Sequence, residues 1–245
     1  MVPYNIRWGI LGKLEKRAIQ QVVCANNFFL SAATGWIADS TVPLHAIPSP
    51  YLSSRRVLLA NGGKIVFVHD LLIDPTLRSS SDVSHTVVAV ASSSSEERAT
   101  KFIKDTGIPA AGCKAYGTYE ELVADRNVDV VYVATPHSHH FQNVMLALNA
   151  GKNVLCEKAF TVNGQQARIL CETAQQKHLF LMEAVWTRYF PVSRQIREII
   201  RSGEIGEVLR VIADNSFGDD VEKAFSKEHR MVNKDLAGGA LLDCK

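Results

Sequence analysis

The length, composition and charge of this 245-residue chain are those of an ordinary globular protein. Hydrophobic residues make up 47% and charged residues 21%, which argues against disorder over most of the length. The 27 lysines and arginines nearly balance the 25 aspartates and glutamates, so no basic field predicts binding to nucleic acid or to a lipid surface. The five cysteines form no C-x-x-C pair, which favours a reducing, cytoplasmic location, and no segment has the continuous apolar character of a membrane span.

Strand-like and helix-like segments alternate from residue 83 to about residue 188. Short apolar runs rich in β-branched residues predict strands at 86–91, 128–134, 153–156 and 179–185. Polar capping residues and amphipathic spacing predict the helices between them, with starts at Ser94, Thr118 and Asn163 and a glycine C-cap at Gly151. This alternation predicts an α/β fold with a doubly wound parallel sheet.

The pattern changes after about Arg188. A helix is predicted over 192–202 and a strand over 208–213, followed by a polar stretch with little periodicity. Because one strand cannot form a domain, we expect a second, sheet-containing α/β domain that begins here and is truncated.

A first candidate site is a glycine turn formed by two separated segments. Residues 7–12 resemble a first strand, and leaving out 13–33 creates G-x-G-x-x-A from Gly12, Gly35 and Ala38. Such a turn cradles the pyrophosphate of a dinucleotide, because its glycines let backbone N–H groups approach the phosphates. The alternative, which the spacing alone favours, is a pair of unrelated turn glycines.

The predicted strand at 86–91 ends in serines rather than in an acidic residue. A carboxylate at this point binds the ribose 2′-hydroxyl of NAD. Ser92 and Ser93, with Arg98 one turn into the next helix, instead suit the 2′-phosphate of NADP. The pattern therefore favours NADP over NAD, the alternative being a polar helix cap without a ligand.

The loop after the predicted strand 128–134 contains a histidine-rich sequence. Loops in this position collect ligands in α/β sheets, so we expect Thr135, Pro136, His137 and His140 to contact a cofactor. A metal site formed with His139 is the alternative, but the spacing matches no common metal motif, and we predict no metal.

The next two loops contain charged and aromatic residues. Lys158, beside Glu157, is placed to exchange a proton with a substrate hydroxyl while hydride moves to a nicotinamide. A surface Glu–Lys pair is the alternative. Trp186 and Arg188 could flank the cofactor, or the aromatic residues could form a hinge between domains.

Several strings in this order resemble the glucose–fructose oxidoreductase/inositol dehydrogenase (Gfo/Idh/MocA) family, and within it the fungal NADP-dependent D-xylose 1-dehydrogenases and the dimeric dihydrodiol dehydrogenases. The strings are Trp8–Gly12 with Thr34–Asp39, Ala134–His137 with His140, Ala150–Lys158, Glu183–Arg188 and Gly238–Asp243. The resemblance covers residues 4–12, 34–39 and 69–243.

The resemblance implies a Rossmann domain over residues 1–188 that binds NADP, with segments foreign to the family near 13–33 and 40–67. Residues 189–245 would be the beginning of a C-terminal domain for substrate binding and dimerisation. We interpret the two inserted segments and the truncation as translated non-coding or mis-joined sequence, and we expect weak or absent activity from this chain.

The resemblance further implies oxidation of the anomeric hydroxyl of D-xylose or a related sugar to the lactone. Lys158 matches the family's catalytic lysine, with Ala159 in place of a proline, and Asp243 matches an aspartate near the substrate. The implied cofactor contacts are Gly12, Gly35, Trp36, Ala38, Ser92, Ser93, Arg98, Thr135, Pro136, His137, His140, Glu157, Lys158, Trp186 and Arg188. Family members are expected to be homodimers, although the truncated second domain counts against a dimer here.

Two further functions stay open for the same residues. One is oxidation of a trans-dihydrodiol, and the other is a non-catalytic, NAD(P)-binding regulatory role. Retention of Lys158 beside Glu157 favours an enzyme.

Overall fold

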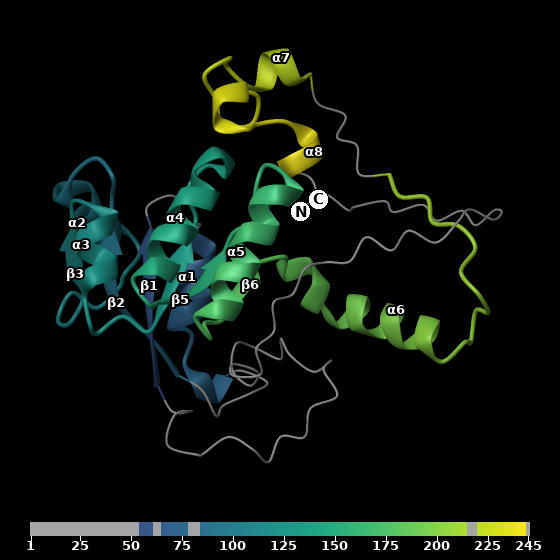
Figure 1. The fold of residues 1–245 in the computed structure, drawn as a ribbon, viewed down its shortest axis with the longest axis horizontal. Helices are drawn as coiled ribbons and strands as arrows, with labels where there is room; N and C mark the ends of the chain where they lie inside the picture. The colour runs from purple at the N-terminus through teal and green to yellow at the C-terminus, as the bar shows by residue number, and fades with distance from the viewer. Residues whose placement is uncertain (1–53, 61–64, 78–83, 215–219, 244–245) are drawn as a thin grey trace.

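A parallel sheet organises the protein. A computed structural model describes residues 54–60, 65–77, 84–214 and 220–243 (Figure 1). Within these residues the sheet has six strands in the order β3-β2-β1-β4-β5-β6, which is the strand order of the doubly wound Rossmann fold and confirms the predicted fold class. The strands are β1 Ser54–Ala60, β2 Ser84–Ala91, β3 Lys114–Tyr116, β4 Val130–Val133, β5 Asn153–Cys156 and β6 Leu181–Glu183.

Helices cover both faces of the sheet, as parallel strands require. Side chains of α1 and α2 pack with Tyr132 and Val90 on one face, and those of α3, α4 and α5 pack with Val131 and Val154 on the other. The helices are α1 Ile65–Leu72, α2 Glu96–Asp105, α3 Tyr119–Ala124, α4 His137–Asn149, α5 Gly164–Gln176, α6 Pro191–Arg201, α7 Val221–Ala224 and α8 Ala240–Asp243. Short 3₁₀ turns lie at η3 Pro75–Leu77, η4 Trp186–Tyr189 and η5 Lys234–Leu236.

The central strand β1 differs from the sequence-based expectation. The sequence interpretation treated residues 40–67 as an interruption, yet residues 54–60 pair in parallel with both β2 and β4. The apolar run Val57–Ala60 has the composition of a strand, and the surrounding prolines and glycines obscured it. The first strand expected at 7–12 lies outside the described residues.

The helix boundaries follow local capping chemistry. Thr118 Oγ1 accepts a hydrogen bond from Glu121 N at 3.2 Å, and Asn163 Oδ1 accepts one from Gln166 N at 2.9 Å, so both predicted caps are confirmed. The cap of α2 is Ser95, which accepts from Arg98 N, and the expected cap Ser94 is wrong by one residue.

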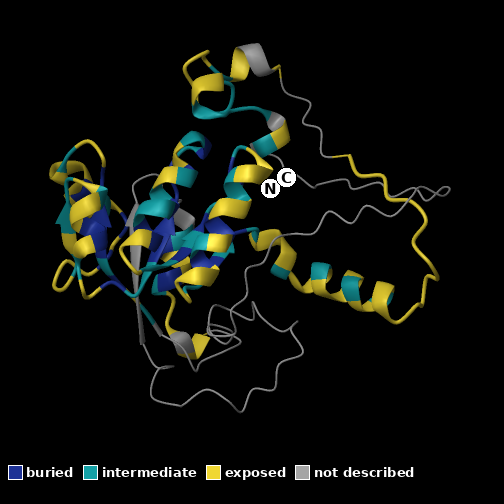
Figure 2. Ribbon diagram, viewed as in Figure 1, coloured by how far each residue is buried: buried dark blue, intermediate teal, exposed yellow. Residues whose placement is uncertain are grey.

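The segment after β6 is mostly exposed. The predicted helix is present as α6, but the predicted strand 208–213 is wrong, because this stretch pairs with no other strand of the described chain. Figure 2 shows α6 without a buried residue, and three of its apolar side chains, Val192, Ile196 and Ile200, are exposed. A strand needs a hydrogen-bonded partner, so an apolar sequence alone does not form one. The domain boundary near residue 188 stays a prediction.

The described residues include no helix of the length and apolarity needed to cross a bilayer.

We expect substitutions in α5 to separate core packing from surface exposure. Leu170 is completely buried against the sheet, whereas the adjacent Ile169 is 38% exposed. Leu170→Ala should lower the free energy of unfolding by about 2–5 kcal/mol through loss of apolar burial and formation of a cavity. Ile169→Ala should change it by only about 0.5 kcal/mol. Urea denaturation measures both, and equal losses would contradict the packing of α5 on the sheet.

Candidate functional site

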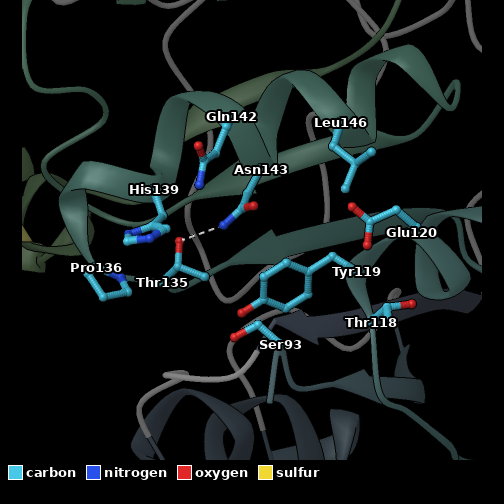
Figure 3. Close-up of a pocket in the computed structure, with 10 residues that line it drawn as sticks. All are labelled: Ser93, Thr118, Tyr119, Glu120, Thr135, Pro136, His139, Gln142, Asn143 and Leu146. Carbon is cyan, nitrogen blue, oxygen red and sulfur yellow. Dashed lines mark hydrogen bonds between the residues drawn. The ribbon is translucent and has the colours of Figure 1, made fainter. Parts of the chain in front are cut away.

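A pocket of about 570 Å³ lies at the carboxyl edge of the sheet (Figure 3). It is bounded by the loops that follow β2, β3 and β4 and by the first turns of α4. Its lining residues are Ser93, Thr118, Tyr119, Glu120, Thr135, Pro136, His139, Gln142, Asn143 and Leu146. Ligands of open parallel sheets bind in this position, where neighbouring strands have connections on opposite faces.

The lining combines an aromatic ring with polar amides. Figure 3 shows the ring of Tyr119 directed toward the space between Ser93 and Thr135. Asn143 Nδ2 donates a hydrogen bond to Thr135 Oγ1 at 3.1 Å, which joins α4 to the loop after β4. The lining contains no lysine or arginine. This combination suits a neutral, planar heterocycle, which can stack on the ring and hydrogen-bond to the amides.

A hydroxyl and guanidinium cluster adjoins the pocket at the end of β2. Ser92 Oγ and Ser94 Oγ are 2.9 Å apart, and Arg98 Nη1 donates to Ser94 Oγ at 3.0 Å. Ser92 is fully buried, whereas Arg98 is exposed on the first turn of α2. The exposed Arg98 and Ser94 lie next to Ser93 in the pocket wall, where they can bind an anionic substituent, whereas the buried Ser92 hydroxyl is hydrogen-bonded to Ser94.

The loop after β5 holds the second part of the site. The Tyr132 hydroxyl donates to Glu157 Oε1, and Glu157 Oε2 accepts from the backbone N–H of Lys158 at 3.2 Å. Burial, together with the nearby Glu157 charge, raises the pKa of Tyr132 well above its usual value. The phenol therefore stays protonated and acts as the hydrogen-bond donor.

His140 links the loops after β4 and β5. Its ring is fully buried, with Nδ1 2.7 Å from the Ala159 carbonyl oxygen and Nε2 2.8 Å from the Thr135 carbonyl oxygen. Burial lowers its pKa, and the two carbonyl groups partly oppose that shift. His140 thus contacts backbone rather than a ligand-accessible surface.

The other two histidines of this loop have separate surroundings. His137 Nδ1 lies 3.1 Å from the Ala237 carbonyl oxygen, so it connects α4 to the turn at η5. His139 is exposed and lines the pocket. Within the described ranges, no cluster of three or more histidine, cysteine, aspartate or glutamate side chains could hold a metal ion.

The structure brings some of the predicted site residues together and separates others. Ser93, Thr135 and Pro136 line the pocket, while Ser92 and Arg98 form the adjoining cluster. Trp186 is 45% exposed and packs edge-on against Phe190. Of the remaining predicted residues, Arg188 is exposed in η4, Asp243 is described only as the last residue of α8, and Gly12, Gly35, Trp36 and Ala38 lie outside the described residues.

Sequence reasoning missed the residues that approach the pocket from the start of α3 and from α4. The missed residues are Thr118, Tyr119, Glu120, Gln142, Asn143 and Leu146. Spacing offered one signal, because His139, Asn143 and Leu146 follow one another at helical intervals and so share a face. Tyr119, the first residue of α3, lines the pocket because α3 packs against α4, which is a tertiary contact without a local sequence signal.

The strand order and the position of the pocket define a Rossmann-type fold, the class of fold that binds dinucleotides at this edge of the sheet. Residues 67–185 match the oxidoreductase family with NAD-binding Rossmann fold, GFO_IDH_MocA, so the chain is similar to this family over that segment.

The relatives include enzymes of both branches expected from the sequence. The chain is 59% identical over 199 residues to a D-xylose 1-dehydrogenase (NADP(+)) of Hypocrea jecorina, an alignment that covers 80% of this chain and 51% of the relative. It is 43% identical to a trans-1,2-dihydrobenzene-1,2-diol dehydrogenase of Xenopus tropicalis, with 66% of this chain and 46% of the relative covered. The chain thus spans about half the length of the curated relatives it matches.

Solved structures show the same fold. An NAD binding oxidoreductase from Klebsiella pneumoniae is similar at a TM-score of 0.56 and 28% identity, over 64% of this chain and 40% of that one. A 3-ketoreductase from Actinomadura kijaniata, in a complex with NADP, is similar at 0.52 and 30% identity, over 63% of this chain and 46% of that one.

We expect His140 to be needed for stability and its neighbour His139 to be dispensable. His140→Ala removes the single ring N–H of the neutral imidazole, which donates to the carbonyl oxygen of Ala159 or of Thr135 according to the tautomer, and opens a cavity between them. This should lower the free energy of unfolding by about 1–3 kcal/mol. His139→Ala changes an exposed side chain and should stay within about 0.5 kcal/mol. Denaturation followed by circular dichroism measures both, and a neutral His140→Ala would contradict the bridging role.

Proposed function

We propose that this chain is the NADP-binding part of an oxidoreductase that oxidises the anomeric hydroxyl of D-xylose or a related sugar to the lactone. The main support is one arrangement at the sheet edge: the pocket with its Ser–Arg cluster on one side, and the Glu157–Lys158 loop on the other. The similarity to the NADP-dependent D-xylose 1-dehydrogenase of Hypocrea jecorina supports the choice of substrate.

The pocket lining fits the adenosine part of a dinucleotide. Tyr119 offers a ring for stacking, while Gln142 and Asn143 offer amides to the edge of an adenine. Arg98 and the serine hydroxyl groups at the end of β2 fit a 2′-phosphate, and no carboxylate stands at the position that would bind the free ribose hydroxyl of NAD. This donor set supports NADP as the cofactor.

Lys158 is the proposed proton acceptor. A nicotinamide held at this edge of the sheet would supply the hydride acceptor for the oxidation of a hydroxyl-bearing carbon. The hydroxyl proton goes to the amine of Lys158, which Glu157 helps to place by accepting the Lys158 backbone N–H. Asp243, at the end of α8, is proposed to act near the substrate on the strength of the family resemblance.

Two alternative functions stay open, and the location and the oligomeric state are proposed as well. The dihydrodiol dehydrogenase relatives support oxidation of a trans-dihydrodiol, and the same pocket would also serve an NAD(P)-binding regulatory protein. A cytoplasmic location is proposed from the five cysteines, which form no C-x-x-C pair, and homodimerisation is proposed from the family resemblance.

We expect Arg98 to determine the preference for NADPH over NADH. Arg98→Gln should raise the Kd for NADPH about 10-fold or more, because a charge-assisted contact to the 2′-phosphate is lost, and leave the Kd for NADH unchanged. Lys101→Gln, a change of an exposed cation three residues after Arg98 on α2, is the matched control. Titration of nucleotide fluorescence measures these constants. Equal weakening of both nucleotides by Arg98→Gln would contradict the assignment.

We expect Lys158 to be required for sugar oxidation but not for folding. Lys158→Met should reduce xylose-dependent formation of NADPH, followed at its near-ultraviolet absorbance, by about 10²-fold or more, since the proton acceptor is removed. Lys177→Met, at the exposed end of α5, should leave the rate unchanged. A panel of pentoses, hexoses and a trans-dihydrodiol identifies the substrate. Because weak or absent activity is expected from this chain, the rates are measured in a version extended to the length of the relatives. NADPH binding by that version without oxidation of any of the substrates would favour the regulatory function.

A further inference from the structure

The backbone around Lys158 is held by the side chain of Glu157 in the same loop and by side chains from two neighbouring elements, α4 and β6. The N–H of Lys158 donates to Glu157 Oε2 at 3.2 Å, and the N–H of Phe160 donates to Glu183 Oε1 at 2.9 Å. Between them, the carbonyl oxygen of Ala159 lies 2.7 Å from Nδ1 of His140. Three consecutive residues of this loop therefore have a backbone group fixed by a side chain.

Glu183 reaches the loop because of the strand register. It is the last residue of β6 and lies opposite Cys156, the last residue of β5, in the parallel pairing. The β5 chain continues from Cys156 directly into Glu157 and Lys158, so a long side chain at Glu183 can span to Phe160. Glu183 is half-buried, so its carboxylate can accept the hydrogen bond from Phe160 while part of the side chain remains in contact with solvent.

Tyr132 fixes the other end of the loop from inside the sheet. Its side chain is completely buried and stacks on Phe67 of α1, with the ring centroids 4.1 Å apart. Its hydroxyl donates to Glu157, the same carboxylate that accepts the Lys158 N–H. A rigid phenol on β4 thus orients a carboxylate on the loop after β5.

We propose that Tyr132 and Glu183 are positioning residues for Lys158 and act through the backbone of residues 157–160. An amine that accepts a proton must lie within hydrogen-bond reach of the reacting hydroxyl, and small displacements reduce the rate steeply. Tyr132 sets the orientation of Glu157 on the N-terminal side of Lys158, and Glu183 sets the backbone on its C-terminal side. The effect of this positioning on the reaction rate rests on the proposed function. The effect on the position of the Lys158 amine does not.

The test measures the Lys158 amine directly in the full chain, without requiring turnover. Competitive labelling with a trace of acetic anhydride, followed by peptide mass spectrometry, gives the reactivity of Lys158 relative to that of the exposed Lys177. The variants are Tyr132→Phe, which removes only the hydroxyl, Glu183→Ala, and Glu183→Gln, whose amide oxygen can still accept from Phe160. Glu172→Ala, an exposed change on α5, is the control.

We expect Tyr132→Phe and Glu183→Ala each to change the Lys158/Lys177 labelling ratio about threefold or more, a size suited to the loss of one orienting hydrogen bond. Glu183→Gln and Glu172→Ala should retain the wild-type ratio. Thermal unfolding of each variant identifies general destabilisation, which would lower the melting temperature without a specific change in the reactivity of Lys158.

Two results would overturn the proposal. One is an unchanged ratio in both Tyr132→Phe and Glu183→Ala. The other is a Glu183→Gln variant that behaves like Glu183→Ala, because the carboxylate charge and not its bond to Phe160 would then be responsible. NADPH titration of the same samples tests the proposed function separately: a wild-type chain that does not bind NADPH contradicts that function and leaves the labelling result intact.

Discussion

The parallel pairing of β4 with β1 and with β5 is the constraint on which the site depends. Parallel strands end at a common edge, so the loops after β4 and β5 meet although about twenty residues of α4 and its connections separate them. His140 then joins these loops through the carbonyl oxygens of Thr135 and Ala159. A change in the register of β5 would break this bridge and displace Lys158.

Buried and half-buried polar groups at this edge are hydrogen-bonded to one another, which restricts the positions that they can take. Glu157 accepts from the Tyr132 hydroxyl and from the Lys158 N–H, and Glu183 accepts from Phe160. A buried polar group left without a partner is costly, so each of these side chains has few alternative positions. The crevice consequently has two distinct parts, a pocket suited to a neutral heterocycle with an adjacent cation, and a stiff loop carrying an amine.

Much of the fold could be predicted from local sequence signals. The strands β2, β4 and β5 and the helices α4 and α5 follow from apolar runs, polar caps and Gly151, whose φ of 75° suits a helix C-cap. The predicted strand 208–213 failed because its pattern was correct for a strand but the described chain supplies no partner to pair with it. Strand β1 was missed because its apolar run is short and is flanked by prolines and glycines. It is a strand in the structure because it pairs with both β2 and β4.

The sequence by itself determined the alternation of strands and helices, the serines and arginine after β2, and the candidate amine at Lys158, because each of these depends on residue type and local spacing. Only the tertiary structure decided that Tyr119 and Asn143 share a pocket, that His140 contacts two backbone carbonyl groups, and that Tyr132 and Glu183 hold the loop around Lys158. These contacts join residues on different elements. The order and register of the strands set their distances, and no local pattern in the chain encodes that arrangement.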